Sequence, residues 1–531
     1  MEKKIIYIFL AFVTLVTSCY KDESSLDILL INPIVIDMGG SPTSYSIFSL
    51  DTLEIKPIVY KEGLNDSNLS FKWILEGNFI VPILLDTTMT LKKCIEVAPQ
   101  GYAYKLIYEV KDNTTGIIQE EIFDIMVKSQ FGSGIVVCDT RDGKTSDVSL
   151  IMAYNFTNSY SQERDTIMRD LFSRIHRRKI AGVASSIRST VYGVNRSLTI
   201  GTDKSIDRVD PFDYSYIDGN GSMFIIDPKN YNVRTIGYEP NSGIELLSIN
   251  GKIYPRSMAN NNKVYSYFLL TNDLSDYHMG IFCRPDWDNG IGFDELNGRL
   301  LEFNLGSSLR TFGSNRLGQN PPFEHNKLQG LTCKAMFTGD NNTMHTILQE
   351  KDPVTGEGIG SIYSYVTKRV PWYFGNAAEN GQPMHIIDLN GLPEISDAKF
   401  FDGTENQSVI YYATDNKIYS IITASPTNIT ANLEYEVPAG EVITSMIGWK
   451  TYQGRVDYTD PNPNSQTKKR TVASLNRMIV LTTYNESTQE GKVISIAIST
   501  LGTGALEVNP EHHGVFGGFG KITAINVQTA F

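Results

Sequence analysis

The sequence predicts an all-β protein in which a β-sandwich is followed by a β-propeller of about seven blades, with one inserted amphipathic helix. Runs of alternating apolar and polar residues, separated by turn residues, fill positions 29–130. From position 131 to 531, a turn followed by an apolar strand recurs at the spacing of four-stranded units. At 531 residues the chain has room for two or more domains, each with its own core.

The beginning of the chain has the pattern of a secretory signal. Lys3 and Lys4 precede an uncharged run at residues 5–16, which is shorter than the roughly 20 residues that cross a bilayer. Small polar residues then lead to Cys19. We therefore expect residues 1–18 to be a signal peptide rather than a membrane-spanning helix.

The segment "LVTSC" at residues 15–19 resembles the lipobox of bacterial lipoproteins. The resemblance implies that Cys19 is lipidated and that residues 19–28 are a lipidated tether. Several acyl chains would then hold the protein on a membrane, since one chain alone anchors a protein only marginally. "YKDE" at residues 20–23 resembles a sorting signal that sends lipoproteins of Bacteroidetes to the cell surface. A plain secreted protein, with a cysteine there by chance, is the alternative.

Residues 29–130 have the composition of an immunoglobulin-like sandwich. Segments such as "LSFKWILEG" and "YAYKLIYEVKDN" alternate in polarity and are separated by turns such as "KDNTTG". About seven such strands in a hundred residues fit that fold. Trp73 is interpreted as its core tryptophan. At this point the chain resembles a polycystic-kidney-disease-type (PKD-like) domain.

Residues 131–531 repeat a turn and strand at irregular intervals. "GKIYP", "GRLLEF", "GSIYSYV", "NKIYSII" and "GKVISIAI" begin 47, 62, 56 and 75 residues apart. These intervals suit propeller blades with variable loops and are too uneven for a solenoid. We expect the last strand, "GKITAINV", to close the ring by pairing near Gly134. Two further β-sandwiches are the alternative.

Residues 161–179 interrupt the β pattern. Ile167, Leu171 and Ile175 recur at helical spacing, acidic residues come first and basic residues come last. The segment predicts an amphipathic helix inserted between blades. Its basic end is interpreted as compensation of the helix dipole, with docking of an acidic partner as the alternative.

Composition excludes some functions. The formal charge of −12 argues against nucleic acid, whose phosphates require clusters of Lys and Arg. Besides Cys19, the four cysteines are far apart, so zinc-ribbon spacing and a dense disulfide scaffold are both absent. We expect mostly buried thiols, although one or two disulfides remain possible. No cofactor and no metal site is predicted.

Motifs for catalysis are missing. "DGKT" at residues 142–145 lacks the first glycine of a phosphate-binding loop, and neither a zinc-protease helix nor a nucleophile elbow occurs. Asp286, Asp288 and Asp294 could offer oxygens to calcium, but the EF-hand pattern is incomplete. His512 and His513 are adjacent and would face opposite ways on a strand. No catalytic residue is therefore predicted.

Aromatic side chains in two predicted loops are the candidate ligand-binding residues. Trp287 lies between two acidic residues, and Trp372, Tyr373 and Phe374 follow a proline. Flat rings of this kind suit the apolar faces of sugars and the side chains of peptides. Packing between blades or against a partner subunit is the alternative.

The order of several segments along the chain resembles that of the PKD-like family lipoproteins of Bacteroidetes. Besides the lipobox, the resemblance rests on "LSFKW", "DPFDYSY", "FDELNGRL" and "GFGKI". It implies an outer-membrane surface lipoprotein that assists a SusC/SusD-like importer, made of a TonB-dependent transporter and its SusD-like lipoprotein, in the uptake of oligopeptides or glycans. We therefore expect a non-enzymatic accessory subunit that captures substrate. A surface propeller hydrolase or lyase, or a purely structural subunit, are the alternatives.

Overall fold

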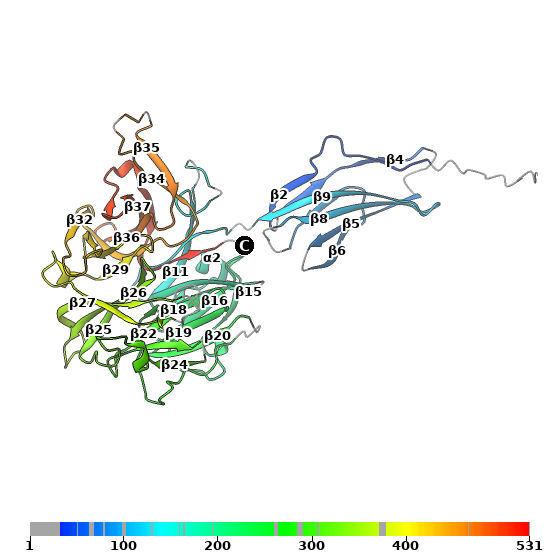
Figure 1. Cartoon of the computed structure of the whole chain (residues 1–531). Coiled ribbons are helices and arrows are strands. Elements are labelled where there is room, and N and C mark those ends of the chain that lie inside the picture. The colour runs from blue at the N-terminus through cyan, green and yellow to red at the C-terminus, as the bar shows by residue number, and fades with distance from the viewer. Residues whose placement is uncertain are drawn as a thin grey trace, which may run out of the picture. The chain divides into compact units, whose positions relative to one another are not determined.

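The computed structural model describes residues 32–529, apart from residues 50, 63–67, 78–79, 98–101, 129–130, 159, 163–164, 194, 260–263, 284–289, 305–306, 371–378, 463 and 466. The chain divides into two compact units, Met1–Lys128 and Ser129–Phe531, where the sequence analysis placed the boundary after residue 130. Both units are built almost entirely of β-strands (Figure 1). Among the described residues, no helix has the length and apolarity needed to span a membrane.

The N-terminal unit contains one five-stranded sheet and two strand pairs. The sheet has the order β2 (Ser44–Phe48), β9 (Ile118–Lys128), β8 (Tyr104–Asp112), β5 (Leu69–Gly77) and β6 (Ile80–Asp86). The pairs join β1 (Val35–Asp37) to β4 (Ile58–Tyr60), and β3 (Thr52–Ile55) to β7 (Leu91–Cys94). All neighbours are antiparallel except β2 and β9, which run parallel.

Alternation in the sequence builds the core of this unit. In β8 the residues Tyr104, Leu106, Tyr108 and Val110 are buried, while the residues between them are more exposed. The prediction for Trp73 is confirmed: it is fully buried, stacks on Tyr108 with ring centroids 4.1 Å apart, and its indole N–H donates to the carbonyl of Thr88. Strands of the sheet and of both pairs therefore share a single core.

Among the described residues of the C-terminal unit, seven sheets of three to five strands follow one another along the chain, besides one two-stranded hairpin. Sheet 1 has the order β12 (Asp165–Met168), β11 (Thr145–Ala153), β10 (Gly134–Thr140), β40 (Lys521–Gln528), with β13 (Ile180–Ala181) paired to β11. Sheet 2 contains β14 (Ala184–Tyr192), β15 (Asn195–Thr202), β16 (Ile206–Val209) and β17 (Tyr216–Gly219). Sheet 3 contains β18 (Val233–Glu239), β19 (Ile244–Ile249) and β20 (Lys252–Ser257).

The remaining sheets repeat this meander. Sheet 4 contains β21 (Phe282–Cys283), β22 (Ile291–Asp294), β23 (Arg299–Asn304) and β24 (Ser308–Thr311); sheet 5 contains β25 (Leu331–Gly339), β26 (Thr343–Lys351), β27 (Gly358–Lys368) and β28 (Pro383–Asp388). Sheet 6 contains β29 (Phe400–Gly403), β30 (Val409–Ala413), β31 (Lys417–Ile422) and β32 (Ala431–Glu436). Sheet 7 contains β33 (Glu441–Gly448), β36 (Met478–Asn485), β37 (Glu490–Thr500), β38 (Ala505–Leu506) and β39 (Gly514–Phe519). Between β33 and β36 in the sequence, β34 (Arg455–Thr459) and β35 (Lys469–Ala473) form a separate hairpin.

The first strands of sheets 2 to 7, together with β40 of sheet 1, lie against one another in order. β14 contacts β18, β18 contacts β21, and the series continues through β25, β29 and β33 to β40, which returns to β14. β40 belongs to sheet 1, where Gly134 is paired with Gln528. The predicted pairing of the last strand near Gly134 is therefore confirmed.

The predicted helix over residues 161–179 is wrong for most of its length. The segment forms β12, which pairs with the edge of β11, and only α2 (Leu171–His176) is helical. Leu171 and Phe172 are buried, whereas Ile175 is exposed. The edge of β11 offers hydrogen-bond partners to the backbone of residues 165–168. This strand pairing outweighs the helical spacing of the apolar residues in the segment.

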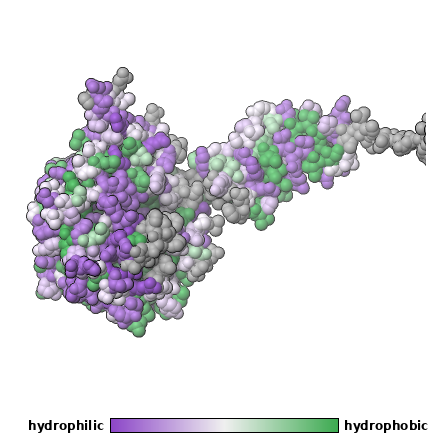
Figure 2. Space-filling model, in the orientation of Figure 1, coloured by the Kyte–Doolittle hydropathy of each residue, from purple (hydrophilic) through white to green (hydrophobic). Residues whose placement is uncertain are grey.

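Polar and apolar side chains are interspersed on the visible surface of the C-terminal unit (Figure 2). The four described cysteines, Cys94, Cys138, Cys283 and Cys333, are not joined in disulfides. Cys138 and Cys333 are buried, whereas Cys94 and Cys283 are partly exposed, so the expectation of mostly buried thiols is met for two of the four.

Candidate functional site

A cavity of about 510 Å³ lies among the first strands of sheets 2 to 7 and β40 of sheet 1. It is lined by Arg188, Ser189, Val191, Tyr238, Pro240, Cys283, Met336, Phe337, Thr338, Arg369, Asp402, Glu405, Ile447, Gly448, Lys450, Thr451, Ile525, Asn526, Val527 and Thr529. Every sheet contributes at least one of these residues. A ligand bound in this cavity would therefore lie among segments that are more than 300 residues apart in the sequence.

One side of the cavity wall carries an ion pair between sheets 6 and 7. Lys450 Nζ lies 2.7 Å from Asp402 Oδ1 and also donates to the carbonyl of Thr338 at 3.2 Å. The backbone N–H groups of Gly403 and Gly448 donate to the same carboxylate at 2.8 and 2.9 Å. Both carboxylate oxygens of Asp402 are therefore occupied by donors of the protein itself.

A second ion pair joins sheets 5 and 6. Arg369 Nη1 lies 3.0 Å from Glu405 Oε1. Burial raises the pKa of Glu405, but the hydrogen bond from Thr338 and the positive charges of Lys450 and Arg369 outweigh burial, so its pKa is lowered. Glu405 is consequently ionised at neutral pH.

The part of the wall formed by sheets 1 to 3 is mostly apolar. Val191 comes from β14, Tyr238 from β18, and Ile525 and Val527 from β40. Arg188 on β14 is the charged residue that this part contributes. On sheet 4, burial raises the pKa of the Cys283 thiol to about 11, so the thiol remains protonated.

The described lining offers both polar and apolar groups to a ligand, and its acidic side chains can be compared with the acid that a hydrolase needs. A hydrolase of this architecture would need a carboxyl whose pKa is raised, so that it can donate a proton. The two acidic residues that line the cavity, Asp402 and Glu405, are both ion-paired in the described part of the chain. Neither is poised as a general acid.

The residues predicted from the sequence to bind ligand lie outside the described residues, as does the lipidation residue. This applies to Trp287, Trp372, Tyr373, Phe374 and Cys19. Trp287 follows the cavity residue Cys283 by four positions, and Trp372 follows Arg369 by three.

Sequence reasoning did not find the charged residues of the cavity. Arg369 comes directly after β27, and Lys450 comes two residues after β33. A charge at the end of an apolar strand is the signal that they share, but many surface residues show it too. Only the arrangement of the sheets brings these residues together.

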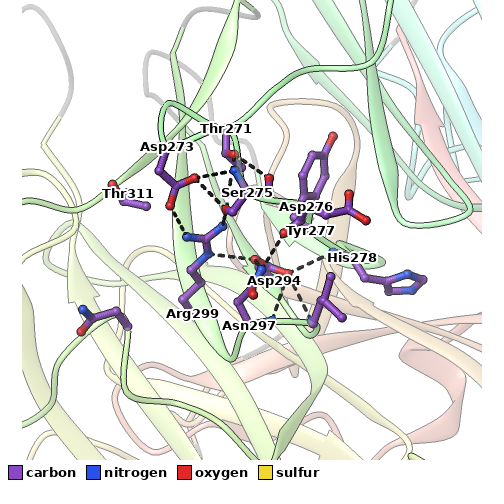
Figure 3. A network of polar contacts seen from close by, with 12 residues as sticks. Thr271, Asp273, Ser275, Asp276, Tyr277, His278, Asp294, Asn297, Arg299 and Thr311 are labelled. Carbon is purple, nitrogen blue, oxygen red and sulfur yellow. Dashed lines mark hydrogen bonds and ion pairs between the residues drawn. The ribbon is translucent and has the colours of Figure 1, made fainter.

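A polar network on sheet 4 is structural rather than a binding site (Figure 3). Arg299 Nε lies 2.8 Å from Asp294 Oδ2, and Arg299 Nη1 lies 2.7 Å from Asp273 Oδ2. Backbone N–H groups of His278 and Leu296 donate to Asp294 Oδ1 at 3.0 and 3.1 Å. Both carboxylate oxygens of Asp294, which was considered above as a calcium ligand, are therefore already bonded to groups of the protein.

The adjacent histidines also differ from expectation. His512 ends a short 3-10 helix, Pro510–His512, and His513 follows it, so they do not alternate across a strand. His512 Nδ1 lies 3.6 Å from Glu507 Oε2, and His513 Nε2 lies 2.8 Å from the carbonyl oxygen of Glu507. Within the described ranges, no group of three His, Cys, Asp or Glu residues has an arrangement that could hold a metal ion.

Comparisons with known proteins give only distant likenesses. No model of a known protein family matches the chain, and no curated protein matches it. The WD40 domain of SCAP from fission yeast is similar over 64% of this chain and 75% of its own, with 10% identity and a TM-score of 0.30. Hsv2 from Kluyveromyces lactis is similar over 65% of this chain and 98% of its own, with 10% identity and a TM-score of 0.32.

Proposed function

We propose that this protein is a ligand-binding protein, in which a seven-bladed β-propeller follows an immunoglobulin-like, PKD-like domain. The seven sheets of the C-terminal unit would be the blades, and their first strands would surround the axis. The cyclic order of contacts from β14 to β40 supports this arrangement. Pairing of β40 with β10 would join the two ends of the ring, because strands from the beginning and the end of the unit then share one sheet.

The axial cavity is the observation that carries the proposal. Its volume of about 510 Å³ lies within the range of about 300–1,000 Å³ that is usual for small-molecule sites. Two ion pairs on one side and apolar side chains on the other would orient a ligand without reacting with it. Binding, rather than hydrolysis, is the function that these groups support best.

For its cellular setting, we propose a lipoprotein anchored through Cys19 on the outer membrane and exposed to the cell exterior. There it would act as an accessory subunit of a SusC/SusD-like importer of oligopeptides or glycans. Substrate held beside the transporter is present at a high local concentration, because binding becomes an intramolecular event when both proteins are tethered. The lipobox-like segment and the family resemblance support this setting.

The test is affinity capture of the full-length protein from outer membranes of its own source in mild detergent, followed by mass spectrometry of proteins and small molecules. A Thr451→Trp variant fills the cavity, and a Thr488→Trp variant adds the same ring to an exposed turn. We expect the transporter, the SusD-like lipoprotein and the substrate to be captured with the unchanged protein and with Thr488→Trp. Thr451→Trp should retain the protein partners and lose the substrate.

Two results would contradict this proposal. Capture of the protein alone would exclude a stable importer subunit. Equal amounts of substrate on both tryptophan variants would show that the cavity is not the binding site.

The aromatic candidates provide a further prediction. If Trp287 and Trp372 stack on the bound ligand, Trp287→Ala and Trp372→Ala should each weaken binding about tenfold, which corresponds to about 1.4 kcal/mol. Isothermal titration with the captured substrate measures this loss. An unchanged affinity, together with a lowered melting temperature, would assign these rings to packing.

A further inference from the structure

A row of apolar side chains crosses the outer face of the five-stranded sheet in the N-terminal unit. Leu84 on β6 pairs with Ile74 on β5. Ile74 pairs in turn with Ile107 on β8, and Ile107 pairs with Ile122 on β9. Because directly opposite residues of neighbouring strands point to the same face of a sheet, these four side chains form one continuous line, which we call the apolar row.

The apolar row faces away from the core of its unit. Tyr108, which follows Ile107 on β8, points to the other face and is fully buried. Leu84 is 56% exposed and Ile122 is 52% exposed, while Ile74 and Ile107 between them are partly exposed. Hydrophobic residues are visible on the surface of this unit in Figure 2. Adjoining exposed apolar side chains that are bordered by charges are typical of an interaction surface.

Charged side chains border the apolar row on both sides. Across β5, β8 and β9, one side carries Lys72, Glu109 and Glu120, and the other carries Glu76, Lys105 and Asp124. Ion pairs of 3.3 Å between Lys72 and Glu109 and of 2.6 Å between Lys105 and Asp124 lie along these borders. On β5 and on β8 the two bordering residues therefore have opposite charges, whereas on β9 both are acidic.

This distribution of charge suits a second copy of the same chain. A two-fold axis along the apolar row would lay each strand over its own counterpart and place one border over the other. Lys72 would then face Glu76 of the second copy, and Glu109 would face Lys105. Each of these attractive contacts would occur twice by symmetry, against one type of repulsive contact on β9.

We propose that two copies of the protein associate face to face through the apolar rows of their N-terminal units. Each row would then be covered by the other, and the bordering charges of β5 and β8 would fix the orientation of the two sheets. This association is separate from ligand binding in the axial cavity, which belongs to the other unit.

The size of the face predicts a weak dimer. Five strands that are about 4.8 Å apart and about seven residues long, at about 3.3 Å per residue, give each copy a face of roughly 500 Å². Association would cover roughly 1,000 Å² in total, which is the lower end of the range for specific interfaces. The two copies should therefore exchange between monomer and dimer rather than form a permanent pair.

The test is sedimentation velocity of the mature protein, residues 19–531, with Cys19→Ser to omit the lipid, up to several hundred micromolar. We expect the sedimentation coefficient to rise with concentration from that of a monomer to that of a dimer. Ile122→Lys places a charge in the apolar row and should weaken association at least tenfold. Ile58→Lys makes the same change on β4, outside the sheet, at a residue that is 59% exposed, and should have no effect.

Charge exchange on β5 tests the two-fold axis itself. Lys72→Glu alone, or Glu76→Lys alone, gives like charges on both borders of this strand and should weaken association at least threefold. The double variant has opposite charges again and should recover the affinity to within twofold. Thermal unfolding of each variant checks that the fold is retained.

Three results would overturn this inference. The protein could remain a monomer at every concentration, which would mean that a second copy is not the partner of the apolar row. A dimer that Ile122→Lys leaves unchanged would form through another surface. A double charge variant that stays as weak as the single variants would exclude the two-fold axis along the row. None of these results bears on the cavity, which Thr451→Trp tests separately.

Discussion

At the scale of single residues, a buried histidine makes the stability of the C-terminal unit sensitive to acid. His345 on β26 is buried, stacks on Phe337 with ring centroids 5.3 Å apart, and shares a 3.0 Å hydrogen bond with the hydroxyl of Ser364. Burial, with smaller contributions from the charges of His385 and Lys450, lowers its pKa to about 3. The folded protein therefore holds this ring neutral.

The sign of the pH effect follows from the two pKa values of His345. Its pKa is about 6.5 in the unfolded chain and about 3 in the folded protein, so between these pH values the unfolded chain binds the additional proton. Stability should fall as the pH decreases below 6.5, by at most about 1.4 kcal/mol per pH unit. Denaturant unfolding at pH 7.5 and 5.0 measures this loss. His345→Gln should reduce the difference; an unchanged pH dependence in this variant would contradict the explanation.

The axial cavity shows why residues of the site escape prediction from one sequence. The burial of Trp73 could be predicted, because its neighbours alternate in polarity over one short strand. Arg188 and Lys450 meet in one cavity although 262 positions separate them, by subtraction of their residue numbers. No local sequence pattern shows that two residues so far apart will be neighbours in the fold. Charged residues near strands are also common on any protein surface.

At the scale of elements, strand recurrence was a better guide than helical periodicity. The turn-and-strand pattern predicted an all-β chain, and the strands are there. The helix over residues 161–179 was wrong because β12 pairs with β11, a contact that depends on a strand edge about 20 residues earlier in the chain. Periodicity describes which face of a segment is apolar, but not whether a neighbouring backbone is available.

The loop at residues 271–278 is joined to sheet 4 by the side chain of Arg299, besides several backbone contacts. Arg299 holds Asp273 in the loop and Asp294 on β22, and the side chain of Asp294 is fully buried. Although burial raises the pKa of Asp273, hydrogen bonds from Ser275 and Arg299 lower it well below its usual range. Losing Arg299 would leave a buried carboxylate without its cationic partner.

We therefore expect Arg299→Met to destabilise the protein by about 3–5 kcal/mol, the usual cost of removing one partner of a buried ion pair. Lys399→Met, which breaks the exposed pair between Lys399 and Asp415, is the matched control and should cost about 0–1 kcal/mol. Chemical denaturation compares the two variants. Similar losses in both would show that Arg299 does not hold the loop.

At the scale of the whole molecule, the two units have separate cores, and the second depends on its last strand. β40 pairs with β10 and also contacts β14 and β33, so it joins sheets 1, 2 and 7. The core of the N-terminal unit includes no residue beyond Val127. Loss of β40 should therefore affect one unit only.

A chain that ends at Gly520 tests this dependence. We expect its C-terminal unit to lose cooperative unfolding and become sensitive to protease, while a fragment of residues 32–128 resists digestion. A chain shortened only by residues 530–531 is the control and should behave like the full-length protein. Digestion of both units at the same rate in the shortened chain would show that the N-terminal unit needs its neighbour.

Because Gly134 pairs with Gln528, strand β10 cannot complete its sheet until the end of the chain has been synthesised. Between the emergence of β10 and that of β40 the ribosome must add about 390 residues, which takes about 20–80 s at usual bacterial and eukaryotic rates. During this interval one edge of β10, a strand of almost entirely buried residues, has no partner. Such an edge can pair with other chains, so we expect misassembly before the last strand is made to involve residues 134–140.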